Sequence, residues 1–157
     1  MCNIPVAVAD EETVVRALRQ CHVSRKGKLK DIVFRPAPGT DEVSVMRHTY
    51  TKSDFCKAKA KEIASGDPKN PYVGLAAIAV ESIRSLKSEV TDSREEYCGH
   101  AHISHGVVAP AAGEPLNPEL IGRLRDLNES ARLLIDPAPE TETWSGEQVE
   151  ITAQASG

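Results

Sequence analysis

Four side chains that can bind a metal ion or carry a proton lie close together near the middle of the chain. They are Cys98, His100, His102 and His105, all within the segment Tyr97–Gly106. Three of the five histidines and one of the four cysteines of this 157-residue chain lie there. Imidazole and thiolate are common zinc ligands, and imidazole also titrates near neutral pH. This segment is therefore the first candidate for a functional site.

Apolar and polar residues alternate over Cys98–Ser104, which predicts an extended strand. Cys98, His100 and His102 then point to the same face of that strand. Side chains two residues apart are separated by roughly 6.6–7 Å along a strand, and those four apart by roughly 13 Å. We therefore expect His100 and His102 to form the ligand pair for zinc or another divalent cation, if the segment binds a metal.

A complete metal site needs at least one further ligand, and the sequence leaves its identity open. The candidates are His105, His48, Cys98, Asp92, Glu95 and Glu96. Open coordination positions would let a bound water act as nucleophile, with Glu95 or Glu96 as general base. Arg47 and Arg84 would bind an anionic substrate, because a guanidinium group pairs with carboxylates and phosphates. This set, with Arg47 as a third catalytic candidate, describes a metal-dependent hydrolase.

A second interpretation needs no metal. One histidine can hold a buried hydrogen bond while the others are exposed. Cys98 and His100 could also pair as thiolate and imidazole, but on one strand the base stands beside the sulfur rather than across from it. The chain has no phosphate-binding glycine-rich loop, EF-hand or Gly-x-Ser-x-Gly motif. We therefore favour a non-catalytic module in which His100, Arg47 and Arg84 contact a partner protein.

The charge distribution and the cysteines narrow the class of partner and the compartment. Residues 1–70 carry 13 Lys/Arg and 9 Asp/Glu, whereas residues 71–157 carry 6 and 14. The densest basic cluster, Arg25–Lys30, has no interleaved aromatic residue, so we expect a solvated turn and no nucleic-acid partner. The cysteines form no Cys-x-x-Cys pair, and neither a signal peptide nor a membrane-spanning apolar run is recognisable. We expect a cytoplasmic chain with free thiols and no membrane contact.

The helices and strands that position these residues are predicted from the periodicity of the apolar residues and from the residues that begin or end an element. Helices are predicted at 11–20, 54–65 and 118–135, and strands at Leu29–Phe34, Glu42–His48, Val73–Val80, Lys87–Thr91 and Cys98–Ser104. Residues 73–86 also fit a helical stripe, but we expect a strand to Val80 and a helical turn through Leu86. The strands Leu29–Phe34 and Glu42–His48 would pair as a hairpin.

Together these elements predict a single α+β domain over residues 1–139. Its sheet would be mixed or antiparallel, with about four to five strands and about three helices packed against it. An acidic tail follows over residues 140–157, and Trp144 with Val149 and Ile151 is expected to dock part of it as an edge strand. The Lys57, Lys59 and Lys61 face of the second helix would stay exposed.

Three segments resemble a pattern in small uncharacterised bacterial proteins. They are Val43–Arg47, Val73–Ala76 leading into Ile83 and Arg84, and His100–Ile103. In those proteins a Ser-Val strand, a Gly-rich apolar strand and a His-Ala-x-Ile segment recur in that order, and the likeness spans residues 10–106. The resemblance carries no activity. It implies that His100 belongs to the shared pattern, whereas His102, His105 and Cys98 are particular to this chain.

These observations lead to an expectation and an alternative. We expect a small cytoplasmic bacterial protein that acts as a protein-interaction or accessory module, with a protein partner or a second copy of itself. It would need no cofactor. The alternative is the metal-dependent hydrolase that uses His100 and His102, with zinc or another divalent metal.

Overall fold

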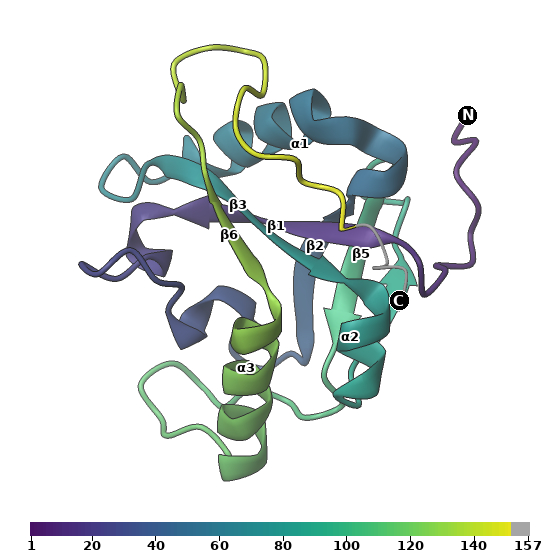
Figure 1. The fold of residues 1–157 in the computed structure, drawn as a ribbon. Coiled ribbons are helices and arrows are strands. Elements are labelled where there is room, and N and C mark those ends of the chain that lie inside the picture. Colours follow the sequence, from purple (N-terminus) through teal and green to yellow (C-terminus); the bar gives the residue numbers. More distant parts are fainter. Residues whose placement is uncertain (152–157) are drawn as a thin grey trace, which may run out of the picture.

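A computed structural model describes residues 1–151 of the chain (Figure 1). These residues build one six-stranded antiparallel sheet in the order β4-β5-β2-β1-β3-β6. The strands are β1 (Thr13–Arg19), β2 (Glu42–Arg47), β3 (Tyr72–Ala79), β4 (Glu89–Asp92), β5 (His100–Ser104) and β6 (Arg132–Ile135). The α-helices are α1 (His48–Ala64), α2 (Val80–Ser85) and α3 (Pro118–Ser130), and two short 3-10 helices are η1 (Gln20–His22) and η2 (Asp31–Phe34). The predicted α+β class is confirmed, with six strands in place of four to five.

Each face of the sheet is covered by its own apolar core. On one face α1 packs against β1, β3 and the buried side chain of Met46. On the other face α2, α3 and η2 cover the sheet, and Phe34, Ile83 and Leu124 are buried there. Figure 1 shows α1 on one side of the strands and α3 on the other. The sheet is thus the middle layer of the fold.

The predicted helix over residues 11–20 is wrong, because this segment is the inner strand β1. Its side chains alternate between the two cores: Val14 and Leu18 pack on the α3 face, and Val15 and Ala17 on the α1 face. A strand that is buried on both faces reads as a continuous apolar run without the alternation of a half-exposed strand. The acidic residues just before β1 are also typical of the first turn of a helix, and they favoured the wrong prediction.

Two further element predictions need correction. Residues 29–34 form no strand and no hairpin, since η2 occupies Asp31–Phe34 and β2 pairs with β1 and β5 instead. The predicted helix 118–135 ends at Ser130, and its last residues are the separate strand β6. Asn117 caps α3 as expected, because its side chain accepts a hydrogen bond from the backbone N–H of Glu119. The strand followed by a helical turn over 73–86 is confirmed by β3 and α2.

The predicted lysine face of α1 is only partly exposed. Lys57 is fully buried, and its ammonium lies 3.0 Å from Asp136 while donating to the carbonyl oxygens of Ala138 and Thr143. A buried charge is costly unless it is paired and hydrogen-bonded, and here it is both. Lys57 thereby fastens the segment that follows β6 onto α1.

Part of the acidic tail packs against the domain, but it does not form the expected edge strand. Val149 is buried in the α1-side core, and Trp144 and Ile151 pack against that core from its margin. No strand is assigned between residues 140 and 151. Residues 152–157, which belong to the same predicted tail, lie outside the described part of the chain.

A disulfide joins Cys2 to Cys98, with the two Cα atoms 5.4 Å apart. This contradicts the expected set of free thiols; Cys21 and Cys56 are the cysteines that remain free. In residues 1–151 no helix is long and apolar enough to cross a bilayer.

Candidate functional site

The two histidines of the predicted metal pair share one face of β5. His100 lies opposite Met46 of β2 and His102 opposite Ser44, and their ring centroids are 6.3 Å apart. His100 is buried, with its Nδ1 hydrogen-bonded to the hydroxyl of Ser93 and its ring against Tyr97. Burial lowers the pKa of His100, so the ring is neutral at pH 7. The strand and the shared face that the sequence predicts are therefore present.

Most of the side chains considered as a third ligand are engaged elsewhere. His105 lies on the opposite face of the sheet, between the hydroxyl of Ser88 and the carbonyl oxygen of Phe34. Cys98 cannot ligate a metal, because its sulfur is in the disulfide. His48 and Asp92 are bonded to other side chains, and Glu95 and Glu96 are exposed. Among residues 1–151 no three His, Cys, Asp or Glu side chains gather around a common point.

Arg47, which was expected to bind an anion or assist catalysis, is completely buried and has a structural role. Its guanidinium makes two bonds to Glu12 and one to Asp92. The remaining two donors reach the carbonyl oxygens of Pro5 and Ala7. A guanidinium has five N–H donors, so none is left for a ligand. Arg47 instead ties the N-terminal segment to the ends of β2 and β4.

Arg84, the second expected anion-binding residue, is partly exposed and already paired. Its Nη1 lies 2.6 Å from Asp10, and its Nε lies 2.6 Å from Glu89. These pairs fasten α2 to the start of β4 and to the turn before β1. The structure therefore does not bring Arg84 near the histidine pair in a common site.

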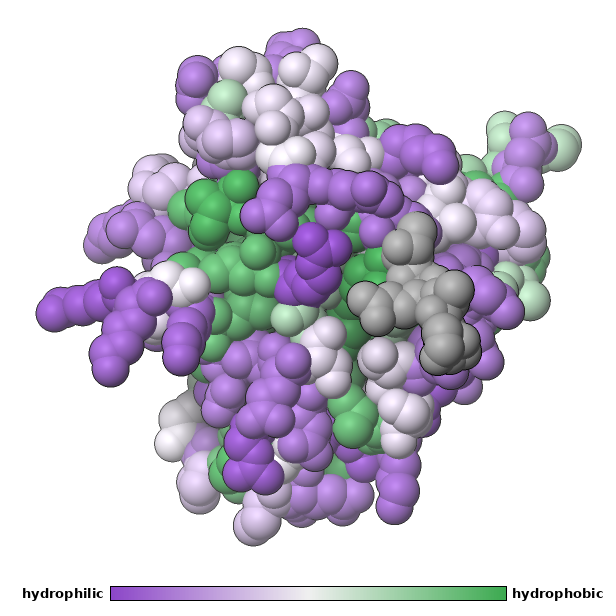
Figure 2. All heavy atoms as spheres, viewed as in Figure 1, coloured by the Kyte–Doolittle hydropathy of each residue, from purple (hydrophilic) through white to green (hydrophobic). Residues whose placement is uncertain are grey.

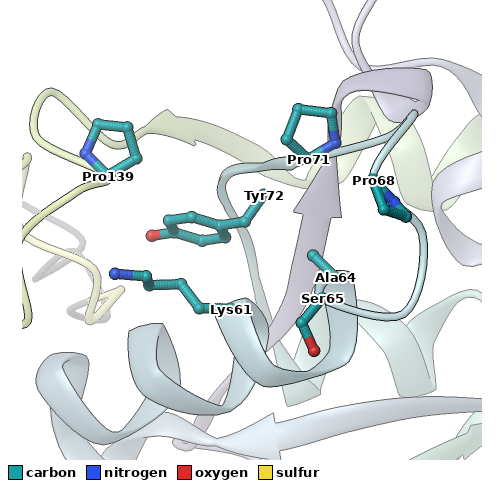
Figure 3. Close-up of a pocket in the computed structure, with 7 residues that line it drawn as sticks. All are labelled: Lys61, Ala64, Ser65, Pro68, Pro71, Tyr72 and Pro139. Atoms are coloured by element: carbon teal, nitrogen blue, oxygen red, sulfur yellow. The ribbon is translucent and has the colours of Figure 1, made fainter.

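One hollow, with a volume of about 390 Å³, lies at the carboxyl end of α1 (Figure 3). Its lining residues are Lys61, Ala64, Ser65, Pro68, Pro71, Tyr72 and Pro139. Figure 3 shows the Tyr72 ring and the Lys61 chain extending in the same direction, away from Pro68. The Tyr72 hydroxyl donates to Asp136. The pKa of Tyr72 is raised mainly by burial and further by this hydrogen bond. The hollow thus offers apolar surface, with its hydroxyl and ammonium groups bonded to the protein.

A different feature lies at the end of the sheet away from β4 and β5, where β6 forms an open edge. Among the strands of the described residues, β6 pairs only with β3. The backbone N–H of Asp136 donates to the carbonyl oxygen of Val73. This bond determines which residues of β6 direct their N–H and C=O groups toward β3. Leu134 therefore bonds toward β3, while the N–H and C=O groups of Leu133 and Ile135 point outward. Within residues 1–151 these four outward groups have no hydrogen-bond partner.

Gly74 allows β6 to approach β3 closely at this edge. It lies opposite Ile135, and a Cβ added to it would be 2.1 Å from the carbonyl oxygen of Leu134. Only glycine fits a position where another backbone comes so near. The glycine therefore sets the position of the open edge.

Two hollows lie beside the outward residues of β6, on either side of the basic loop 24–28. The first, of about 320 Å³, is walled by Val23, Val73 and Ile135. The second, of about 330 Å³, is walled by Leu29, Ala131 and Leu133. Figure 2 shows apolar surface on the side of the molecule where β6 lies in Figure 1, bordered by hydrophilic side chains that project into solvent.

The charge around this edge is positive. Arg25, Lys26 and Lys28 are exposed on the loop, and the side chain of Arg132 on β6 is 44% exposed. Glu147 pairs with Arg132 at 3.3 Å, and Glu129 lines the second hollow. Basic side chains outnumber acidic ones, which favours an acidic ligand.

The sequence drew attention to the basic cluster Arg25–Lys30 but not to this edge. The apolar run Leu133–Ile135 continued the helical periodicity of α3, so no strand was expected there. A short apolar run that ends just before Asp136-Pro137 is also typical of a strand, so this pattern could have identified β6.

Comparison with known proteins adds no assignment. No family model, no curated protein and no solved structure matches the chain.

Proposed function

We propose that this chain is a protein-interaction module that binds an extended, acidic segment of a partner protein along the outer edge of β6. The observation that carries the proposal is the pair of outward-facing residues, Leu133 and Ile135, each of which also lines a hollow. A peptide that adds a strand to a sheet gains affinity from main-chain hydrogen bonds and specificity from pockets for alternate side chains. Both requirements are met along β6.

The spacing of the hollows supports an extended ligand. Leu133 and Ile135 are two residues apart, and alternate side chains of a strand are roughly 6.6–7 Å apart. A partner strand that pairs with β6 repeats the same spacing, so its alternate side chains reach the two hollows. Val23 and Leu29, at the two ends of the basic loop, complete the walls.

The charge distribution favours an acidic partner over a second copy of this chain. Pairing two β6 edges would bring two sets of Arg25, Lys26 and Arg132 together, and like charges at close range oppose association. An acidic segment would instead be attracted to the loop before it docks. A self-complementary dimer through β6 is therefore the outcome that contradicts this assignment.

A metal-dependent hydrolase, our alternative from the sequence, receives no support from the site geometry. His100 and His102 share a face of β5, but within residues 1–151 no third ligand joins them: Cys98 is in the disulfide, and His105 lies on the opposite face of the sheet. The expected cytoplasmic location remains a prediction. The Cys2–Cys98 disulfide weighs against it, because disulfides persist mainly in oxidising compartments.

The test starts from a library of randomised nine-residue peptides selected on the full chain. Affinities of the selected peptides are then measured by fluorescence anisotropy at low and high salt. We expect acidic sequences with apolar residues two positions apart, and binding that weakens with added salt. Peptides without acidic residues, or salt-independent binding, would contradict the proposal.

Two variants locate the binding edge. Ile135→Pro removes one outward N–H and keeps the bonds that Leu134 and Asp136 make to β3, and we expect affinity to fall about tenfold or more. Ile135→Val keeps the N–H and most of the apolar surface, and it should bind almost as the wild type does. Equal affinity of the proline variant and the wild type, with both folded, would refute docking at β6.

A further inference from the structure

Ser53, His48 and Glu150 form a continuous hydrogen-bonded chain where the C-terminal segment crosses the start of α1. The hydroxyl oxygen of Ser53 lies 2.8 Å from Nε2 of His48. The other ring nitrogen, Nδ1, lies 2.6 Å from a carboxylate oxygen of Glu150. Nucleophilic serines in hydrolases are activated by this order of groups: hydroxyl, Nε2, Nδ1 and carboxylate.

The surrounding bonds fix the orientation of each group. The hydroxyl of Thr49 donates to the second carboxylate oxygen of Glu150, while its oxygen accepts from the backbone N–H of Thr13. The carboxylate is therefore held at both oxygens. Nδ1–H of His48 donates to Glu150, and Nε2 is left to accept the Ser53 proton. The side chain of His48 is only 6% exposed, whereas that of Glu150 is 29% exposed and Ser53 is half-buried.

The backbone is strained just before the serine. Lys52 has φ 66° and ψ 167°, and it separates the turn at His48 from the helix that continues from Ser53. This conformation is essentially restricted to glycine and costs about 1–3 kcal/mol in other residues. Strain of this kind concentrates at functional sites, where the surrounding structure imposes it. Here it turns Ser53 back toward the imidazole.

We propose that Ser53 is a nucleophile that accepts a small acyl group from an ester. Its oxygen attacks the carbonyl carbon, and the hydroxyl proton passes to Nε2 of His48. Glu150, a positioning residue, stabilises the resulting imidazolium. The positive end of the helix that continues from Ser53 stabilises the charge on the carbonyl oxygen.

The remaining steps balance with water as the only co-reactant. The tetrahedral intermediate collapses by breaking the bond to the leaving alcohol, which takes the proton from His48. Water then attacks the acyl group on Ser53, gives its proton to His48 and releases the carboxylic acid as the serine recovers its proton. None of the hollows described above is lined by Ser53, so the proposal is limited to a small acyl group such as acetyl.

The test uses the full chain with two probes, a fluorophosphonate and p-nitrophenyl acetate. We expect one equivalent of phosphonyl label, located on Ser53 by peptide mass spectrometry, and hydrolysis of the ester above the buffer rate. Ser53→Ala should lose both. Ser65→Ala, at the far end of the same helix, should retain both. Label that is absent from Ser53, or equal in Ser53→Ala, would overturn the proposal; mapping on the wild type decides this even if a variant misfolds.

The roles of the other two residues have separate readouts. His48→Gln should slow labelling about 100-fold or more, the usual contribution of a general base. Glu150→Gln should slow labelling, and Glu150→Asp should restore part of it. Unchanged rates in His48→Gln and Glu150→Gln would show that Ser53, if labelled, is not activated by this chain of bonds.

Discussion

Substituting Gly74 by alanine tests whether β6 is held where the proposed edge requires it. The added Cβ would be 2.1 Å from the carbonyl oxygen of Leu134, a backbone atom that cannot rotate away. β6 must therefore move outward by roughly 1.3 Å or more to reach an ordinary van der Waals distance. That movement stretches the bonds of Leu134 and Asp136 to β3 and loosens the packing of Leu134, which is 2% exposed.

The cost can be worked out from these contacts. Two weakened backbone bonds cost about 1 kcal/mol each, and partial loss of Leu134 packing costs about 1–2 kcal/mol more. We expect the free energy of unfolding to fall by about 3–4 kcal/mol, which lowers Tm by roughly 6–16 °C for a domain of this size. The measurement is urea and thermal unfolding followed by circular dichroism.

A second glycine provides the control. Gly122 lies within α3, where an added Cβ would meet only the end of the Arg125 side chain at 3.9 Å. Gly122→Ala should raise stability by about 0.5–1 kcal/mol, because alanine favours helix. A Gly74→Ala variant that unfolds within 1 kcal/mol of the wild type would refute the close approach of β6 to β3.

Further predictions concern acid stability, the disulfide and the core. Burial, with Arg neighbours adding to it, lowers the pKa of His22 to about 4, so the unfolded chain binds a proton below pH 6.5 that the folded chain does not. The wild type should therefore lose about 2 kcal/mol more stability than His22→Asn between pH 7 and pH 5 in urea titrations, and equal losses would contradict this. Alkylation of the unfolded, non-reduced chain should modify two of its four cysteines, and four reactive thiols would exclude the disulfide. Cys2→Ser, which removes the link to Cys98, should lower the free energy of unfolding by about 2–4 kcal/mol. Leu124→Asp places an unpaired charge in the core and should unfold or aggregate the chain. Ile121→Asp, at a position 46% exposed on the same helix, should melt near the wild type. A Leu124→Asp variant that also melts near the wild type would show that α3 packs against nothing.

Local signals predicted part of the fold well. The cap at Asn117, the strand at Val73–Val80 and the alternating segment around His100 each combine a periodic pattern with a boundary residue, and all three are present. β1 was mistaken for a helix because other elements cover both of its faces, which its own sequence does not reveal. β6 was mistaken for a helix because its apolar residues continue the apolar spacing of α3.

The candidate sites were harder to predict, since they depend on contacts between distant segments. Arg47, which was expected to bind an anion, is surrounded by Glu12, Asp92 and N-terminal carbonyl groups, and no local pattern in the sequence could indicate these contacts. The serine and its carboxylate are 97 residues apart in the sequence and meet only when the C-terminal segment crosses α1. The sequence could identify residue types suited to chemistry, but tertiary contacts decide which of them remain available.

Amide hydrogen exchange along β6, followed by NMR on the ¹⁵N-labelled chain, tests the proposed binding edge most directly. In the free chain the Leu134 amide should exchange slowly, while the outward amides of Leu133 and Ile135 should exchange fast. A saturating selected acidic peptide should slow both outward amides about tenfold or more, since each gains a main-chain partner. Outward amides that are already protected in the free chain, or that stay fast with the peptide bound, would contradict the account.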